Sequence, residues 1–186
     1  MKLMLMAASM KKESLNKKLI SIADRLLKQQ GHESHLYQFE DFVMPLYHGD
    51  LETKEGLPKA TTDFISHMQD HDALIISSPE YNFSTPGTLK NMIDWVSRKS
   101  PMPWTKQIVL LMSASPALAG GHRGLWQTRI PLEGCGAFVY PDMFALSAAH
   151  TAFNEDGSLK DESLTKRLEN TLKEFTVFVK NNKIIS

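Results

Sequence analysis

Cysteine is almost absent from this chain of 186 residues, which contains only Cys135. One cysteine cannot form an intramolecular disulfide, an all-cysteine zinc site or a cysteine-ligated iron–sulfur cluster. An excess of either charge is also missing, because 21 Lys and Arg residues balance 21 Asp and Glu residues. The chain therefore lacks the general electrostatic attraction of a typical nucleic-acid or membrane-surface binder, and we expect neither partner.

Long apolar runs are missing as well, and no segment approaches the roughly 20 residues that a transmembrane helix needs. The chain starts with MKLMLMAASMKK, where basic and polar residues occupy the place of a signal-peptide cleavage site. We interpret this start as a buried strand and expect a cytoplasmic protein. With 42% hydrophobic and 23% charged residues, the composition is that of a globular protein, and we expect one domain over residues 1–186.

Short apolar segments alternate with amphipathic ones along the chain. Strands are predicted at 2–8, 34–39, 73–78 and 107–113, and a fifth at either 137–140 or 143–146. Helices are predicted at 14–31, 59–70, 86–99, 121–132 and 164–179, and a long loop at 41–57. This alternation predicts a doubly wound α/β domain, in which right-handed crossovers place helices on both faces of a mostly parallel sheet.

Ligands of such sheets bind beyond the carboxyl ends of the strands. The first segment in that position is SMKKESLN, at 9–16, which combines short polar side chains, lysines and the free N–H groups of a helix start. These groups suit a dianionic phosphate. The alternative is that Ser14 only caps the helix and the lysines are solvated. Neither GxGxxG nor GxxxxGK[ST] is present, so the sequence supports neither a dinucleotide fingerprint nor a Walker loop.

Two more segments follow predicted strands. In SPEYNFSTPG, Pro79 ends the strand because it has no N–H to donate, and the loop exposes main-chain groups that suit the edge of a flat heteroaromatic ring. The alternative is an ordinary turn with Tyr81 in the core. In SASPALAGGHRG, Gly120 and Gly121 allow a ligand to approach the backbone closely. The alternative there is a turn that only starts a helix.

The run PEYNFSTPGTLKNMIDWVSR, at 79–98, resembles the signature of the NAD(P)H-dependent FMN reductases, a group that includes bacterial quinone and chromate reductases and some azoreductases. AASMKKESLN is similar to the phosphate loop of that family, SASPALAGGHRG to its third flavin loop, and AFNEDGSLKD to the turn before its last helix. The resemblance covers nearly the whole chain. It implies a three-layer α/β/α flavodoxin-like fold with a five-stranded parallel sheet of order 2-1-3-4-5.

Carried over by position, the resemblance assigns FMN contacts to three groups of residues. The phosphate group is Ser9, Lys11, Ser14, Leu15 and Asn16. The isoalloxazine edge is Pro79, Glu80, Tyr81, Asn82, Phe83 and Ser84. The other side is closed by Ser113, Ser115, Gly120 and Gly121. Ala8 and Lys11 stand where the family has glycine and arginine, so we expect a point charge in place of a bidentate fork and weaker phosphate binding.

The resemblance also implies the reaction. NADPH or NADH would pass hydride to FMN, and a quinone, free flavin, azo dye or metal oxyanion would then take the electrons in ping-pong order. No side chain is expected to be catalytic, while main-chain donors would stabilise the reduced flavin. His122 and Arg123 are candidates for contacting the nicotinamide phosphate.

Two other functions remain as alternatives. A flavodoxin-type electron carrier would bind FMN but not oxidise NAD(P)H, and such carriers are strongly acidic whereas this chain is neutral. A flavin-free binding or regulatory protein is disfavoured by the intact PEYN run.

Smaller features have simpler interpretations. Trp95, Met102 and Trp104 belong either to the core or, as the resemblance suggests, to a subunit interface of a homodimer or homotetramer. His67 and His71 have a spacing that can bind metal, but no third ligand is near in the sequence, so we expect a solvated helix end and no metal. Cys135 is expected to be a buried thiol.

Overall fold

A computed structural model describes residues 1–182, so 183–186 of the predicted domain lie outside the described residues. The strands are β1 (Lys2–Ala7), β2 (Glu33–Tyr37), β3 (Ala73–Ser77), β4 (Ile108–Ala114), β5 (Phe138–Val139) and β6 (Phe144–Leu146). They form one parallel sheet of order β2-β1-β3-β4-β5, and β6 also pairs with β4. This order confirms the flavodoxin-like arrangement.

The last strand position is shared by two short strands. Ile108 of β4 pairs with Phe138 of β5, and Met112 of β4 pairs with Phe144 of β6. The prediction of one strand at either position is therefore corrected, because both segments pair with β4. Pro141 lies between them and has no N–H for the ladder, which explains the interruption.

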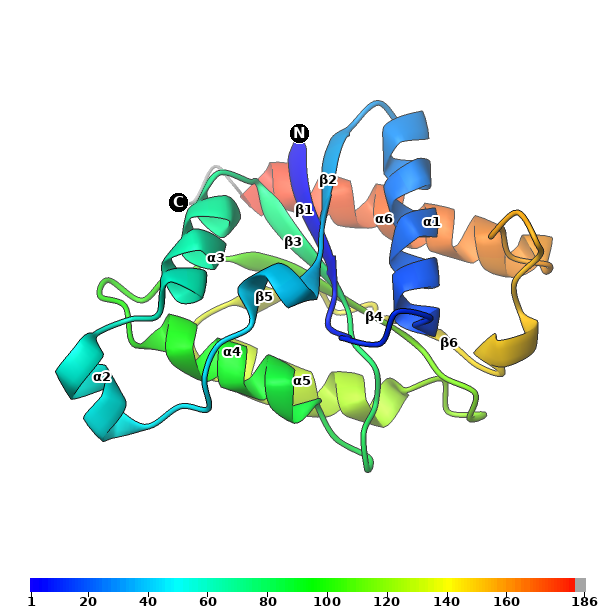
Figure 1. The fold of residues 1–186 in the computed structure, drawn as a ribbon. Coiled ribbons are helices and arrows are strands. Elements are labelled where there is room, and N and C mark those ends of the chain that lie inside the picture. The colour runs from blue at the N-terminus through cyan, green and yellow to red at the C-terminus, as the bar shows by residue number, and fades with distance from the viewer. Residues whose placement is uncertain (183–186) are drawn as a thin grey trace.

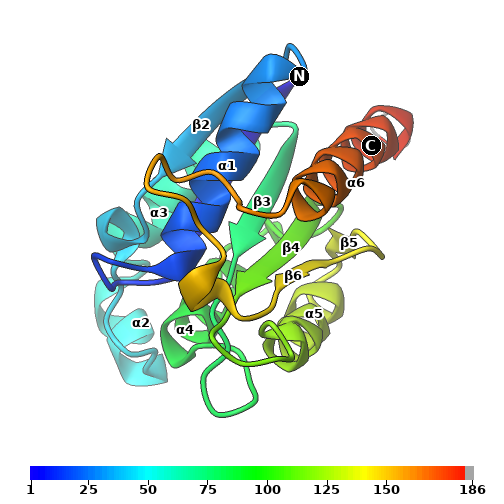
Figure 2. The same ribbon diagram turned by 90° about the vertical axis from the view of Figure 1, so that its right-hand side faces the viewer.

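Helices cover both faces of the sheet (Figures 1 and 2). They are α1 (Leu15–Gln29), α2 (Gly49–Glu55), α3 (Lys59–Gln69), α4 (Gly87–Ser97), α5 (His122–Gly134) and α6 (Glu162–Asn182). The side chains of β1 alternate between the faces: Leu3 and Leu5 pack with α1 and α6, while Met4 and Met6 pack with α3, α4 and α5. Among residues 1–182, no helix is long and apolar enough to cross a membrane.

The segment predicted as a loop at 41–57 contains a helix. After a 3-10 turn at Phe39–Phe42, the short helix α2 projects from the rest of the domain, at the left of Figure 1. None of its residues is buried, so it has no apolar period for sequence analysis to detect. Side chains of α4 hold this region instead: Asn91 accepts a hydrogen bond from the N–H of Tyr47 at 2.8 Å, and Trp95 donates one to the carbonyl of Pro45 at 2.7 Å.

Two further interpretations can now be decided. Trp95 and Trp104 are completely buried within this chain, so they belong to its own core and are not available to a partner subunit, while Met102 is partly buried against the same cluster. The solvated helix end is wrong for His71, whose ring is buried between α3 and β2. Its Nδ1 lies 2.6 Å from the His67 carbonyl oxygen and its Nε2 lies 2.8 Å from Nδ1 of His35.

The single thiol is only partly buried. Cys135 follows α5, and its N–H contacts the last carbonyls of that helix. Burial raises the pKa of the Cys135 thiol, which favours its protonated form.

Candidate functional site

The loops that follow β1, β3 and β4 meet at the carboxyl edge of the sheet, toward the lower end in Figure 2. Between them lies a cleft of about 200 Å³. It is lined by Ser9, Lys11, Glu13, Ser14, Leu15, Asn16, Pro79, Glu80, Tyr81, Ala114, Ser115 and Pro116. The structure thus brings together residues from all three segments that the sequence singled out.

A larger hollow of about 430 Å³ lies along the exposed side of α1 and shares Glu13 and Ser14 with the cleft. Three of its four cations have partners: Lys17 pairs with Glu40, Lys18 lies over the ring of Phe153, and Arg25 donates hydrogen bonds to the carbonyls of Asp156 and Gly157. We therefore place the candidate site in the smaller cleft, where parallel sheets of this topology bind ligands.

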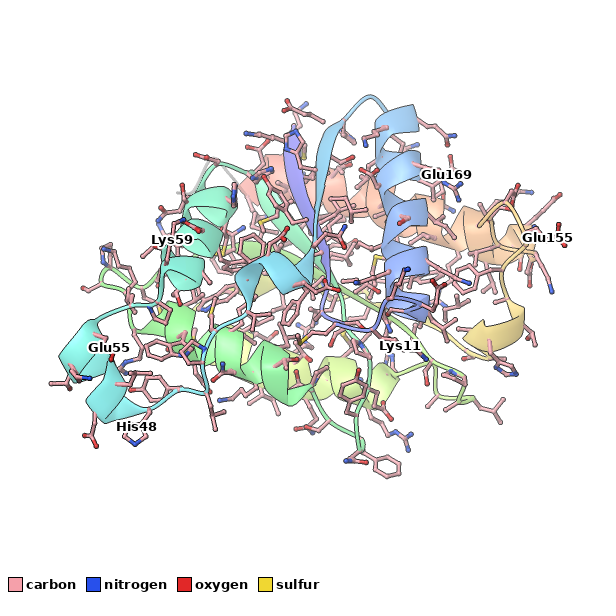
Figure 3. The ribbon with its side chains drawn as sticks, viewed as in Figure 1. Lys11, His48, Glu55, Lys59, Glu155 and Glu169 are labelled. Atoms are coloured by element: carbon pink, nitrogen blue, oxygen red, sulfur yellow. The ribbon has the colours of Figure 1, made fainter. Side chains whose placement is uncertain are left out.

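The β1–α1 loop presents donors to the cleft. Ser14 is the N-cap of α1, and its hydroxyl accepts a hydrogen bond from the N–H of Lys17, so the capping interpretation is correct. It also lines the cleft, so capping and ligand contact do not exclude each other. Ser9 is buried beside it, and Lys11 is exposed near the start of α1 (Figure 3). Hydroxyls, an ammonium group and the free N–H groups of a helix start fit a phosphate dianion.

Asn16 has a structural task as well as a place in the cleft. Its Oδ1 accepts hydrogen bonds from the N–H of Ala114 and the hydroxyl of Ser77, both at 2.9 Å. Its Nδ2 donates to the carbonyl of Ala114 at 3.0 Å. The side chain therefore fixes the start of α1 to the carboxyl ends of β3 and β4, and most of its hydrogen-bonding capacity is used there.

The loop after β3 contains a tight turn. Tyr81 and Ser84 exchange two main-chain hydrogen bonds of 3.1 and 3.0 Å, and the φ angles of Asn82 and Phe83 are 50° and 64°. Positive φ at both central residues is the geometry of a type I′ turn, which asparagine tolerates and phenylalanine rarely adopts. Tyr81 is 52% exposed, so its placement in the core is wrong, and Phe83 is 65% exposed.

Glu80 turns its carboxylate toward α5. Oε2 accepts a hydrogen bond from the N–H of Gly124 at 2.9 Å, and Oε1 accepts two from Arg123 at 2.8 and 3.2 Å. Burial alone would raise the pKa of Glu80, but the hydrogen bonds from Gly124 and Arg123 outweigh it and hold this pKa below its ordinary value. Glu80 is therefore ionised at neutral pH and is occupied by its partners.

Of the two predicted nicotinamide contacts, Arg123 is held by other side chains, whereas His122 is exposed. The Arg123 guanidinium lies 4.2 Å from the centre of the Phe83 ring, in addition to its contact with Glu80. The exposed His122 ring is edge-on to Trp126, with centroids 6.0 Å apart. Sequence analysis did not find the contacts of Glu80 with α5, because the partners lie far apart in the chain and no motif connects them.

The third loop is held by Ser113, which is completely buried and donates a hydrogen bond of 2.5 Å to the carbonyl of Gly120. Both glycines have positive φ, and a Cβ on Gly121 would lie 2.8 Å from the Ser113 hydroxyl. The group that approaches the backbone of Gly121 closely in this structure is therefore the Ser113 side chain. Gly121 is also the N-cap of α5, as the helix-starting interpretation expected. Ser115 lines the cleft itself.

Comparisons with known proteins agree with this geometry. The family model described as NADPH-dependent FMN reductase matches residues 1–151. A quinone reductase of Escherichia coli is 31% identical over 143 residues, which is 76% of each chain. An NAD(P)H:quinone oxidoreductase of Solanum tuberosum is 29% identical over 169 residues, covering 90% of this chain and 87% of the relative.

Among solved structures, the flavoenzyme NAD(P)H:(acceptor) oxidoreductase FerB of Paracoccus denitrificans superposes with a TM-score of 0.83. The two chains are 25% identical, and the match covers 97% of this chain and 98% of the other.

Proposed function

The chain belongs to the NADPH-dependent FMN reductase family, and from this membership we propose that its cleft binds FMN, which NADPH or NADH reduces for a small-molecule acceptor. The acceptors we propose are quinones, free flavins, azo compounds and metal oxyanions. The observation that carries the proposal is the meeting of a phosphate-type donor set and two flavin-type loops at one sheet edge. As a member of this family, the protein is an NAD(P)H-dependent flavin oxidoreductase.

Bound FMN supplies the hydride and electron transfer, and the chain positions it. We assign the phosphate to the hydroxyls of Ser9 and Ser14, the ammonium group of Lys11 and the helix N–H groups of Leu15 and Asn16. The main chain of the Pro79–Ser84 loop would line one edge of the ring, and Ser115 would lie on the other side. Ser113, Gly120 and Gly121 would support that side from behind.

No side chain needs to act as an acid or base in this scheme. Two carboxylates line the cleft. Glu80 is shielded from water, and hydrogen bonds from Gly124 and Arg123 keep it ionised. The other cleft carboxylate, Glu13, is exposed. Main-chain donors that face the ring would stabilise negative charge on the reduced flavin.

The electron-carrier alternative is less well supported. The chain has a formal net charge of +0, and its matched relatives are named as reductases that use NAD(P)H or a quinone. We retain the carrier only as an outcome of the experiment below.

We further propose that the protein is a cytoplasmic homodimer or homotetramer and that residues 1–186 form one flavodoxin-like domain. Trp126 and Ile130 lie four residues apart on α5 and are 52% and 64% exposed, a pair of apolar side chains that a second copy could cover. A single cysteine and an NAD(P)H donor suit a reducing compartment.

The decisive test is a visible spectrum of the protein with FMN, followed by anaerobic addition of NADPH and then NADH. We expect bound flavin that either or both nucleotides bleach rapidly, and the faster donor defines the preference. Bound flavin that neither nucleotide bleaches would point to a carrier. Failure to bind FMN would contradict both functions.

The phosphate assignment can be tested at Ser14. In Ser14→Ala we expect weaker FMN binding together with a loss of about 1 kcal/mol of helix capping. Ser14→Asp is the matched control, because aspartate keeps the cap but places a negative charge beside the phosphate. Ser14→Asp should therefore keep its thermal stability and still lose FMN affinity. An unchanged FMN dissociation constant in both variants would remove the assignment.

A further inference from the structure

Helix α5 takes its N-terminal cap from another part of the chain. Its own N-cap residue, Gly121, has no side chain to accept a hydrogen bond from the first turn. Glu80 supplies the missing acceptor, because its Oε2 binds the N–H of Gly124, three residues after the N-cap. A serine or aspartate cap normally binds that same N–H. The loop after β3 is thereby attached to the start of α5.

Arg123 makes the attachment two-sided. Its guanidinium binds Glu80, the residue just before the turn, and lies over the ring of Phe83, the third residue of the turn. The Glu80 side chain is only 9% exposed, whereas the Arg123 side chain is 49% exposed, so the carboxylate is the sheltered partner of this ion pair. One arginine therefore holds both the base and the tip of the loop.

The backbones of loop and helix also lie in contact. A Cβ built on Gly124 would be 3.0 Å from Cβ of Glu80 and 3.1 Å from the carbonyl oxygen of Ser84. The turn itself contains Phe83 in the left-handed region, where a bulky residue is unfavourable. Such a conformation persists only where the surroundings hold it. The hydrogen bonds, ion pair and ring contact of Glu80 and Arg123 are those surroundings.

We propose that Glu80 and Arg123 are positioning residues, which lock the Pro79–Ser84 loop to α5 and so fix its main-chain groups for the flavin ring. The proposal rests on the FMN function above. A loop held before binding loses little freedom when the ligand arrives, and fixed dipoles need no reorganisation when charge develops on the ring. Arg123 also has to leave this contact before it can reach a nicotinamide phosphate.

The experiment compares Glu80→Ala, Glu80→Gln and Arg123→Gln with Glu133→Gln. The control breaks another arginine–glutamate pair of α5, Arg129 with Glu133, at the far end of the helix. The FMN dissociation constant of the apoprotein is measured by quenching of flavin fluorescence. We expect it to rise about 10- to 100-fold in Glu80→Ala, the factor for a lost charged hydrogen bond. The FMN dissociation constant should rise less in Glu80→Gln and Arg123→Gln. In Glu133→Gln it should equal the wild-type value.

Two further readouts separate positioning from general stability. The midpoint potential of the bound flavin should differ between Glu80→Ala and Glu80→Gln, because both variants lack the carboxylate charge but only glutamine restores an acceptor for the N–H of Gly124. Amide hydrogen exchange of the apoprotein should accelerate at 81–84 and at Gly124 in Glu80→Ala.

Wild-type affinity and potential in a folded Glu80→Ala protein would overturn the proposal. If Glu80→Ala fails to fold, Arg123→Gln decides in the same way. If the wild-type apoprotein binds no FMN, the proposed function fails. The attachment of the loop to α5 is tested independently of FMN, because unchanged hydrogen-exchange rates in Glu80→Ala would overturn it.

Discussion

The same combination of glutamate, arginine and aromatic ring holds two surface segments of this protein. At the cleft, Glu80, Arg123 and Phe83 form what we call the flavin-side clamp, in which Arg123 lies 4.2 Å from the ring centre. On the projecting α2 region, which Figure 3 marks by His48 and Glu55, the corresponding residues are Glu52, Arg98 and Tyr47. In this arm clamp Arg98 lies 5.7 Å from the ring centre.

The two clamps differ in how they fit the local electrostatics. Arg98 is the C-cap of α4, where the negative end of the helix dipole favours a cation. Arg123 lies in the first turn of α5, where the positive end disfavours one, so that Glu80 must compensate. Arg98 thus follows a local preference, whereas Arg123 opposes one and Glu80 offsets it. Residues placed against local preference are expected at functional sites, and this difference agrees with the role we propose for Glu80 and Arg123.

After the loss of Glu80 itself, the largest effect should come from filling the contact beneath the flavin-side clamp. In Gly124→Ala the added Cβ meets Glu80 and the carbonyl of Ser84, so the loop has to move outward. Overpacking of this kind costs about 1–3 kcal/mol, and we expect the FMN dissociation constant to rise roughly 10-fold or more. Fluorescence titration of the apoprotein measures it.

The matched control is Gly134→Ala at the other end of α5, where a Cβ meets nothing within 4 Å. This variant should keep its FMN affinity and gain up to about 1 kcal/mol of stability, because alanine favours the helix more than glycine does. Equal FMN affinity in the two variants would show that the contact between loop and helix does not matter for binding.

A change in the contacts of the α2 region should lower the stability of the protein and leave its FMN affinity unchanged. Asn91 bonds the N–H of Tyr47 at 2.8 Å and the carbonyl of Pro45 at 2.9 Å. Asn91→Ala leaves the N–H without that partner, so we expect the free energy of unfolding to fall by about 1–3 kcal/mol in urea titrations. A large loss of FMN affinity in this variant would erase the distinction between the two clamps.

The arm also shows where sequence analysis stops. The apolar periods predicted the five large helices, because Leu19, Ala23 and Leu172 bury their side chains against the sheet, whereas the strand order came from the family resemblance. Helix α2 has no fully buried residue, and apart from the partly buried Leu51 it depends on polar contacts between residues far apart in the chain, such as Arg98 with Glu52. No local pattern predicts a contact of that kind.

The candidate site, too, was only partly predictable from the sequence. Its position followed from the strand ends, and Ser14 and Tyr81 line the cleft as the three-segment reasoning suggested. The partners of individual side chains did not follow. Ser113 is buried beneath the glycine turn and Asn16 is bonded to Ala114, because the tertiary packing decides which polar groups are left for a ligand.

A smaller effect is expected from pH. The pKa of Glu80 in the folded protein lies below its ordinary value of about 4.3, so its contribution is complete above that pH and is lost as the pH falls through the lowered folded-state value. The ratio of FMN dissociation constants between Glu80→Gln and wild type should therefore stay constant down to about pH 4.3 and shrink as the pH falls further. A ratio that does not shrink below this pH would argue against a role for the Glu80 charge.

The smallest effect should come from the same chemical change in the arm clamp. The hydroxyl of Tyr47 and the guanidinium of Arg98 lower the pKa of Glu52, but the pair is more open to water than the Glu80 pair. Glu52→Gln should change the free energy of unfolding very little, because exposed ion pairs contribute little to stability. FMN affinity should not change, whereas Glu80→Gln lowers it. Both variants replace a glutamate by glutamine in a contact with an arginine and an aromatic ring. A difference between them in FMN affinity would therefore come from where the clamp lies in the fold, because the residue types are the same.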